Sequence, residues 1–142
     1  MQIVLSQALQ QQIFSQMETT FPNEGGGFLI GHQHENEIVV EDIIQVENVF
    51  ETEEQYHRYA MTPENWMHIE DEADARGHAV VGYYHSHPNA PAIPSAYDRD
   101  HALPNFLYII TSVQAGKAVD MTAWRLKPDR TAFEQNALLI QA

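Results

Sequence analysis

The 142-residue chain contains no cysteine, which excludes disulfide bonds, thiolate metal sites, CxxC redox centres and a cysteine nucleophile. It also lacks a basic, apolar leader and any apolar run long enough to span a membrane. We therefore expect a cytoplasmic protein that does not associate with a membrane.

Basic residues are scarce: seven Lys and Arg stand against twenty Asp and Glu, for a formal net charge of −13. This charge has the wrong sign for neutralising the phosphates of nucleic acids or anionic lipid headgroups. It would speed encounter with a basic partner, and adaptation to high salt accounts for it equally well. The sequence thus argues against nucleic acid as a partner and leaves the oligomeric state open.

Hydrophobic residues make up 44% of the chain, as in ordinary globular proteins, and the length suits one domain with its own core. We expect a single domain over residues 1–142. Apolar residues spaced as on one face of a helix predict helices over 5–18 and about 63–76. Thr62 suits the N-cap of the second helix and Gly77 its end.

Strand-like segments fill much of the rest. After a break at the glycines 25–27, residues 28–31 begin a strand that turns back at 34–37 into a second strand. Residues 48–61 are polar, acidic and aromatic, and they are expected to form a long loop or irregular strand. A buried strand at 79–87 and three C-terminal strand-like segments complete an α/β domain, in which helices flank a single mixed sheet.

The segment 85–98, HSHPNAPAIPSAYD, carries residues suited to metal chemistry. His85 and His87 are two residues apart on a predicted strand, so both imidazoles lie on one face and can converge on one ion. Asp98, on a short helix expected to begin at Ser95, can supply a third ligand. Two histidines and one carboxylate leave one position of a tetrahedral ion for water, as in hydrolytic zinc sites.

Ser95 precedes Asp98 by about one helical turn, so its hydroxyl would lie beside the open position and could stabilise an oxyanion. The same S-x-x-D pattern is a capping box, and taken alone the capping role is favoured. A second H-x-H pair, His32 and His34, has no matching Ser and Asp downstream and is interpreted as a solvated turn, with metal binding as the less favoured alternative. At this chain's residue frequencies the full H-x-H-x7-S-x2-D pattern arises by chance with odds on the order of one in a thousand.

A metal-bound water also needs a base, because its proton has to be removed and delivered to the leaving group. Glu24 is the best candidate. It lies in the segment PNEGGG, just before a strand that enters the sheet, where partial burial would raise its pKa. Without a resemblance to a known family, Glu24 would be one of thirteen glutamates, and a role as a polar turn residue would be favoured.

These residues resemble the JAMM (MPN+) metalloprotease family, in which a glutamate in a P-x-E-x-x-G context is followed by H-[ST]-H-P-x6-S-x2-D. The similarity extends to the segments VVGYYHSHP, LYIITS and AWRL and so covers most of the chain. One departure is the run GGG after the glutamate, where many relatives have Cys or Ala. The chain has every element of the signature, namely Pro22, Glu24, Gly27, His85, Ser86, His87, Pro88, Ser95 and Asp98.

The resemblance implies a cytidine deaminase-like architecture, with Zn²⁺ bound by His85, His87 and Asp98 and with water as the fourth ligand. It further implies that Glu24 is the general acid/base and that Ser95 donates to the tetrahedral oxyanion. Members of the family cut isopeptide or peptide bonds after the C-terminal Gly-Gly of ubiquitin or ubiquitin-like proteins. The chain is similar to the short prokaryotic type, whose substrates are small ubiquitin-like sulfur-carrier proteins.

Two other functions stay open at this level. A non-catalytic MPN scaffold would bind partners without hydrolysis, although relatives of that kind lack the ligands that are all present here. A peptidase of the same family acting on phage-tail or cell-wall peptides would use the same zinc chemistry in another cleft.

Overall fold

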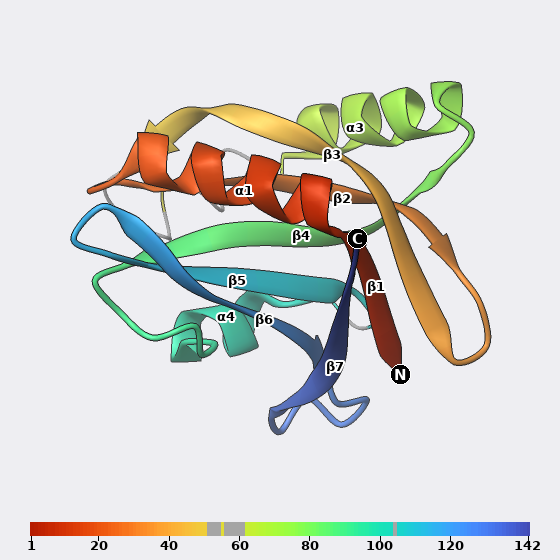
Figure 1. The fold of residues 1–142 in the computed structure, drawn as a ribbon. Coiled ribbons are helices and arrows are strands. Elements are labelled where there is room, and N and C mark those ends of the chain that lie inside the picture. Colours follow the sequence, from red (N-terminus) through yellow and green to blue (C-terminus); the bar gives the residue numbers. More distant parts are fainter. Residues whose placement is uncertain (51–54, 56–61, 104) are drawn as a thin grey trace.

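The strands of the computed structural model, which describes residues 1–50, 55, 62–103 and 105–142, pair into one sheet. Within these residues the strand order is β1-β3-β2-β4-β5-β6-β7, and β7 pairs with β1, so the sheet closes into a barrel (Figure 1). The strands are β1 (Gln2–Ser6), β2 (Glu24–Gln33), β3 (Glu37–Phe50), β4 (Ala79–Pro88), β5 (Leu107–Gln114), β6 (Lys117–Leu126) and β7 (Phe133–Gln141). The helices are α1 (Gln7–Thr20), α3 (Pro63–Ala75) and α4 (Ala96–His101).

The closure of the sheet depends on β1. This strand pairs in parallel with β3 on one side and β7 on the other, so that Ile3 lies opposite both Ile38 and Leu138. The mixed α/β class is confirmed. The expected single sheet flanked by helices is confirmed in part, because the strands do form one mixed sheet, but strands from the two ends of the chain pair with each other and close it into a barrel. The cytidine deaminase-like architecture and the single domain over 1–142 stay predictions.

The first helix begins later than predicted, because the residues before it form β1. The Oγ atom of Ser6 accepts a hydrogen bond from the backbone N–H of Leu9 and caps α1. The second helix is confirmed as α3, with Thr62 as its N-cap and Gly77 at a φ of +77° just beyond its end. None of the described helices is long and apolar enough to cross a bilayer.

The predicted break at 25–27 is wrong, since β2 begins at Glu24 and runs through the glycines. A Cβ atom on Gly27 would lie 2.3 Å from the carbonyl oxygen of Ile44, so glycine allows close approach here rather than a turn. The hairpin between β2 and β3 is confirmed. β3 extends to Phe50, and the rest of the predicted loop over 48–61 lies outside the described residues, apart from Gln55.

Helices cover both faces of the sheet, and this decides where the chemistry-bearing residues point. The buried side of α1 packs with Tyr84 in one cluster, and the buried side of α3 packs with Tyr83 in another. Successive residues of β4 therefore point to opposite faces. By the same alternation Ser86 shares the α1 side, and His85 and His87 share the side of Tyr83, whose ring centroid lies 5.6 Å from that of His85.

The close approach of β4 and β5 predicts that a larger side chain at Gly82 lowers the stability of the fold. A Cβ atom on Gly82 of β4 would lie 2.2 Å from the carbonyl oxygen of Leu107 on β5. We expect Gly82→Ala to lower the free energy of unfolding by about 1–3 kcal/mol or more, because the two strands would have to separate. Urea denaturation followed by circular dichroism measures this.

The control is Ala79→Gly at an exposed position of the same strand, which should cost only about 0.5–1 kcal/mol. A Gly82→Ala variant no less stable than the control would contradict the close packing of β4 on β5.

Candidate metal centre

The two histidines of the motif lie at the C-terminal end of β4, where neighbouring strands hold them on both sides. β2 places Gly26 opposite His85, and β5 places Ser112 opposite His87. His85 and His87 are 3% and 7% exposed, and their Nε2 atoms are 3.1 Å apart. The predicted convergence of the two imidazoles on one face is therefore present.

Asp98 reaches the imidazoles because a capping box fixes the start of α4. Its Oδ2 atom accepts a hydrogen bond from the backbone N–H of Ser95 at 2.8 Å, and the Oγ atom of Ser95 accepts one from the N–H of Asp98 at 3.0 Å. The capping role that the sequence favours is confirmed. The same cap leaves Oδ1 3.4 Å from the Nε2 atom of His85 and Oδ2 3.7 Å from that of His87.

These three side chains form a potential ligand set. Within the described part of the chain, His85, His87 and Asp98 are the one group of three or more potential ligands whose donor atoms all lie within 4.8 Å of one another. Two imidazole nitrogens and a carboxylate oxygen suit a divalent transition metal, and three protein ligands leave a coordination position open. The donor set therefore fits a hydrolytic metal rather than a closed structural site.

A backbone carbonyl orients one of the imidazoles. The Nδ1 atom of His87 lies 2.9 Å from the carbonyl oxygen of Pro91, to which it donates, so the lone pair of a neutral ring is on Nε2, facing His85 and Asp98. No residue-type pattern identifies Pro91 as part of the site, because a backbone carbonyl is present at every position. A loop of defined length after an H-x-H strand is the only sequence signal for such a contact.

Glu24 begins β2 and lies beside this group. Its position two residues before Gly26, which is opposite His85, brings it toward the end of β4. Burial raises the pKa of Glu24, the charges of His85 and His87 act to lower it, and the charge of Asp98 raises it further. The raised pKa agrees with the partial burial expected from the sequence.

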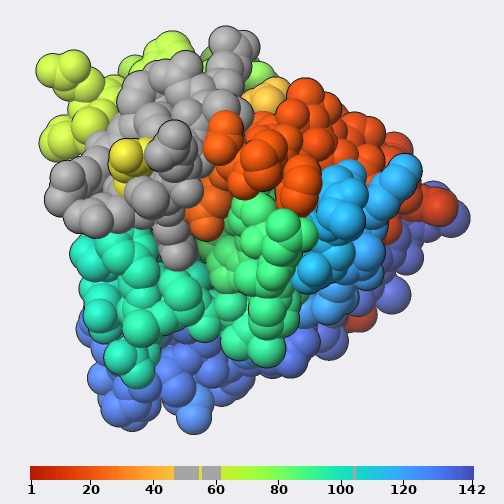
Figure 2. Space-filling view, turned by 90° about the vertical axis from the view of Figure 1, so that its left-hand side faces the viewer, coloured from red at the N-terminus to blue at the C-terminus, as the bar shows by residue number. Residues whose placement is uncertain are grey.

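Ser86, between the two histidines, connects β4 to the segment that carries Glu24. Its Oγ atom accepts a buried hydrogen bond from the backbone N–H of Gly25 at 3.1 Å. A serine on the opposite face of β4 from the imidazoles thus fixes the residue that follows Glu24. Figure 2 shows the start of β2 (orange), the end of β4 (green) and α4 (teal) meeting on one face of the molecule.

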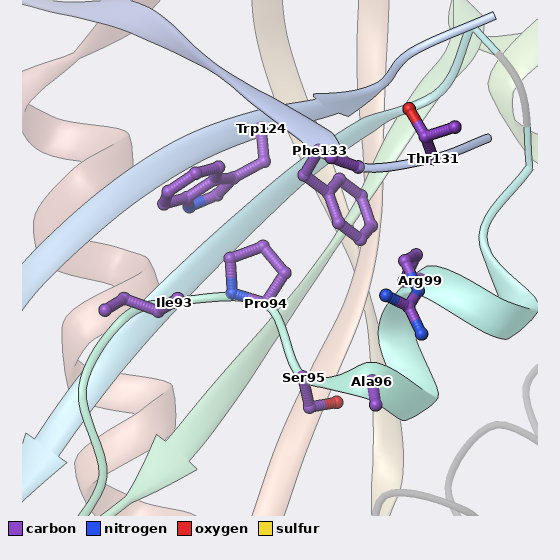
Figure 3. Close-up of a pocket in the computed structure, with 9 residues that line it drawn as sticks. Ile93, Pro94, Ser95, Ala96, Arg99, Trp124, Thr131 and Phe133 are labelled. Carbon is purple, nitrogen blue, oxygen red and sulfur yellow. The ribbon is translucent and has the colours of Figure 1, made fainter. Parts of the chain in front are cut away.

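A cavity of about 310 Å³ borders the start of α4 (Figure 3). Ser95 belongs both to this cavity and to the capping box that holds Asp98. The walls are largely apolar, with Trp124 from β6 and Phe133 from β7, and the guanidinium of Arg99 adds one positive charge. The full lining is Ile93, Pro94, Ser95, Ala96, Arg99, Trp124, Thr131, Ala132 and Phe133.

Comparison with known proteins gives one family match and several structural neighbours. A model of prokaryotic homologs of the JAB domain matches residues 6–127. The desampylase of Haloferax volcanii is 40% identical over 55 residues, which are 38% of this chain and 40% of that protein, so the match spans less than half of the relative.

Among solved structures, a protein of Salinibacter ruber is 33% identical with a TM-score of 0.74, over 98% of this chain and 90% of that one. A protein of Desulfitobacterium hafniense has a TM-score of 0.80 at 22% identity, over 99% and 93% of the two chains. A JAB1/MPN domain protein of Archaeoglobus fulgidus has a TM-score of 0.62 at 18% identity, over the whole of both. These last two likenesses concern the fold alone.

Metal uptake is expected to release a proton from His87. Burial alone would lower the pKa of His87, but hydrogen bonds to Asp98 and to the carbonyl of Pro91, with the charges of Asp98 and Glu24, raise it above its ordinary value. A metal binds only the deprotonated nitrogen, so the apparent affinity for Zn²⁺ should rise about tenfold per pH unit below that pKa and level off above it.

Competition with a chromophoric chelator between about pH 5 and pH 8 measures this dependence. After correction for the chelator's own titration, an affinity that does not change with pH would contradict the assignment of His87 as a ligand.

Proposed function

The chain belongs to the family of prokaryotic homologs of the JAB domain, the short prokaryotic type of JAMM/MPN protein, and from this we propose that it is a zinc-dependent isopeptidase. The observation that carries the proposal is the buried group of His85, His87 and Asp98 with the carboxyl group of Glu24 beside it. Zinc is proposed because two imidazoles and one carboxylate with an open position are the donor set of catalytic zinc sites.

In this proposal the substrate is a ubiquitin-like protein of the sulfur-carrier type, and the bond after its C-terminal Gly-Gly is cleaved. The reaction takes place in the cytoplasm. The partial likeness to a protein named desampylase supports a ubiquitin-like modifier as the substrate. The same likeness favours a ubiquitin-like substrate over phage-tail or cell-wall peptides. The complete ligand group argues against a non-catalytic scaffold.

The proposed reaction is amide hydrolysis. Water adds to the carbonyl carbon, the C–N bond breaks, the amine departs, and the acyl part is released as a carboxylate. When bound, zinc would polarise the carbonyl and make water more acidic. Glu24 takes the proton of the attacking water and passes it to the departing amine. Its raised pKa suits both halves of this transfer, because the conjugate acid is then a proton donor closer to neutral pH.

Ser95 stabilises the charge that develops on the carbonyl oxygen. Its Oγ atom accepts the capping hydrogen bond from the backbone N–H of Asp98, and a serine hydroxyl is able to donate as well as to accept. Because the cap fixes the Oγ atom, the donor is already in place before the substrate reacts. The cavity beside Ser95 then offers room for a substrate side chain on the leaving side, since two glycines have no side chain to fill it (Figure 3).

The role of Glu24 is tested by Glu24→Gln, which keeps the shape of the side chain and removes its basicity. We expect turnover of a carrier protein with a cleavable C-terminal extension to fall by at least about 100-fold, with zinc content unchanged. Mass spectrometry of the products and metal analysis of the same sample measure both quantities. Asp98→Asn is the comparison and should lose zinc as well as turnover.

Wild-type turnover by zinc-loaded Glu24→Gln would exclude Glu24 as the acid/base. Loss of zinc in that variant would instead assign Glu24 to the ligand set.

The role of Ser95 beyond capping is tested by Ser95→Ala. Loss of the cap should cost about 0.5–2 kcal/mol of stability, and loss of the donor should lower kcat by about 100–1,000-fold with little change in KM. Ser95→Thr keeps a hydroxyl for both roles and should restore most of the activity. If fully zinc-loaded Ser95→Ala kept the wild-type kcat, Ser95 would be a cap only.

A further inference from the structure

The second H-x-H pair lies at the far end of β2 from Glu24 and is not absorbed by the proposed function. His34 begins the turn into β3, as the sequence predicts, but the interpretation as a turn is wrong for His32, which belongs to β2. The two imidazoles meet: the Nδ1 atom of His32 is 2.9 Å from the Nε2 atom of His34, and the ring centroids are 4.8 Å apart. This contact resembles the one between His85 and His87, whose Nε2 atoms are 3.1 Å apart.

Glu41 on β3 fixes which nitrogen of His32 carries the proton. The Nε2 atom of His32 is 3.1 Å from the Oε1 atom of Glu41, and a carboxylate only accepts hydrogen bonds. Nε2 is therefore the protonated atom of the neutral ring, and the lone pair of Nδ1 faces His34. The arrangement is that of a carboxylate that orients a metal-binding imidazole through its far nitrogen.

The spacing of the two nitrogens suits a cation with ligands at right angles. Two nitrogens about 2.0–2.1 Å from one ion and about 90° apart lie about 2.9 Å from each other. We propose that His32 and His34 form a second, peripheral site that binds a divalent transition-metal ion preferring tetragonal coordination, such as Cu²⁺ or Ni²⁺. When His34 carries its proton on Nδ1, the lone pairs of its Nε2 atom and of the Nδ1 atom of His32 are both available to the ion.

The surroundings agree with a cation at this place. Glu41 contributes a negative charge next to His32, and the whole chain carries a net charge of −13. The ring of His78 lies nearly parallel to that of His32, with centroids 6.3 Å apart, so a third imidazole is close to the pair. Both partners of the His32–Glu41 pair are about two-fifths exposed, so water can complete the coordination sphere.

The peripheral site is independent of the proposed catalytic centre. Glu24 and His32 are eight residues apart on one strand, which corresponds to about 26 Å. An ion at His32 and His34 therefore does not contact the ligands of the proposed catalytic centre, and its binding can be measured without reference to peptidase activity.

The test counts Cu²⁺ ions on the wild-type chain and on His34→Gln and His32→Gln, by equilibrium dialysis and electron paramagnetic resonance. We expect the wild type to bind one more equivalent than either variant. The extra ion should give a tetragonal signal with hyperfine splitting from two imidazole nitrogens. Glu41→Gln should keep the site and weaken it by about 10–100-fold, because the imidazole loses its orienting partner.

The matched control is His68→Gln, which removes an exposed histidine from α3 and should leave the count unchanged. Equal numbers of bound ions in the wild type and His34→Gln would overturn the proposal. An equal loss in His68→Gln would also overturn it, because it would show scattered binding to surface histidines. Neither result bears on the proposed isopeptidase, which depends on His85, His87 and Asp98.

Discussion

The hydrogen bond from the backbone N–H of Ser95 to the carboxylate of Asp98 is the interaction on which the proposed site depends. It begins a helix of six residues and at the same time holds the carboxylate against the imidazoles. So short a helix has little stability of its own, and the guanidinium of Arg130 supports its other end by donating to the carbonyl of Ala102. The same S-x-x-D pattern therefore caps the helix and positions the carboxylate of Asp98 as a potential ligand.

Charge explains why this geometry favours a divalent cation. Two imidazole nitrogens 3.1 Å apart need a proton or a metal ion between their lone pairs. Asp98 and Glu24, when both are ionised, bring two negative charges to the same buried place, and such charges are costly unless they are neutralised. A divalent cation balances the two carboxylates. Burial, together with the charge of Asp98, raises the pKa of Glu24, which reflects the same cost.

The local part of the site could be predicted from the sequence, and the long-range part could not. Alternation along a strand is enough to place His85 and His87 together, and one helical turn is enough to relate Ser95 to Asp98. Glu24 joins them through strand pairing and through a hydrogen bond between residues 61 positions apart, so only the resemblance to a family could single it out. Closure of the barrel cannot be predicted from local patterns for the same reason, since β1 pairs with β7 from the other end of the chain.

The most direct test of the account is X-ray absorption spectroscopy at the zinc edge on protein loaded with one equivalent of zinc. We expect four nitrogen and oxygen neighbours at about 2.0–2.1 Å, with the outer-shell scattering of two imidazoles and no other histidine. Zinc that fails to bind, or that shows three or more imidazoles, would contradict a site built from His85, His87 and Asp98.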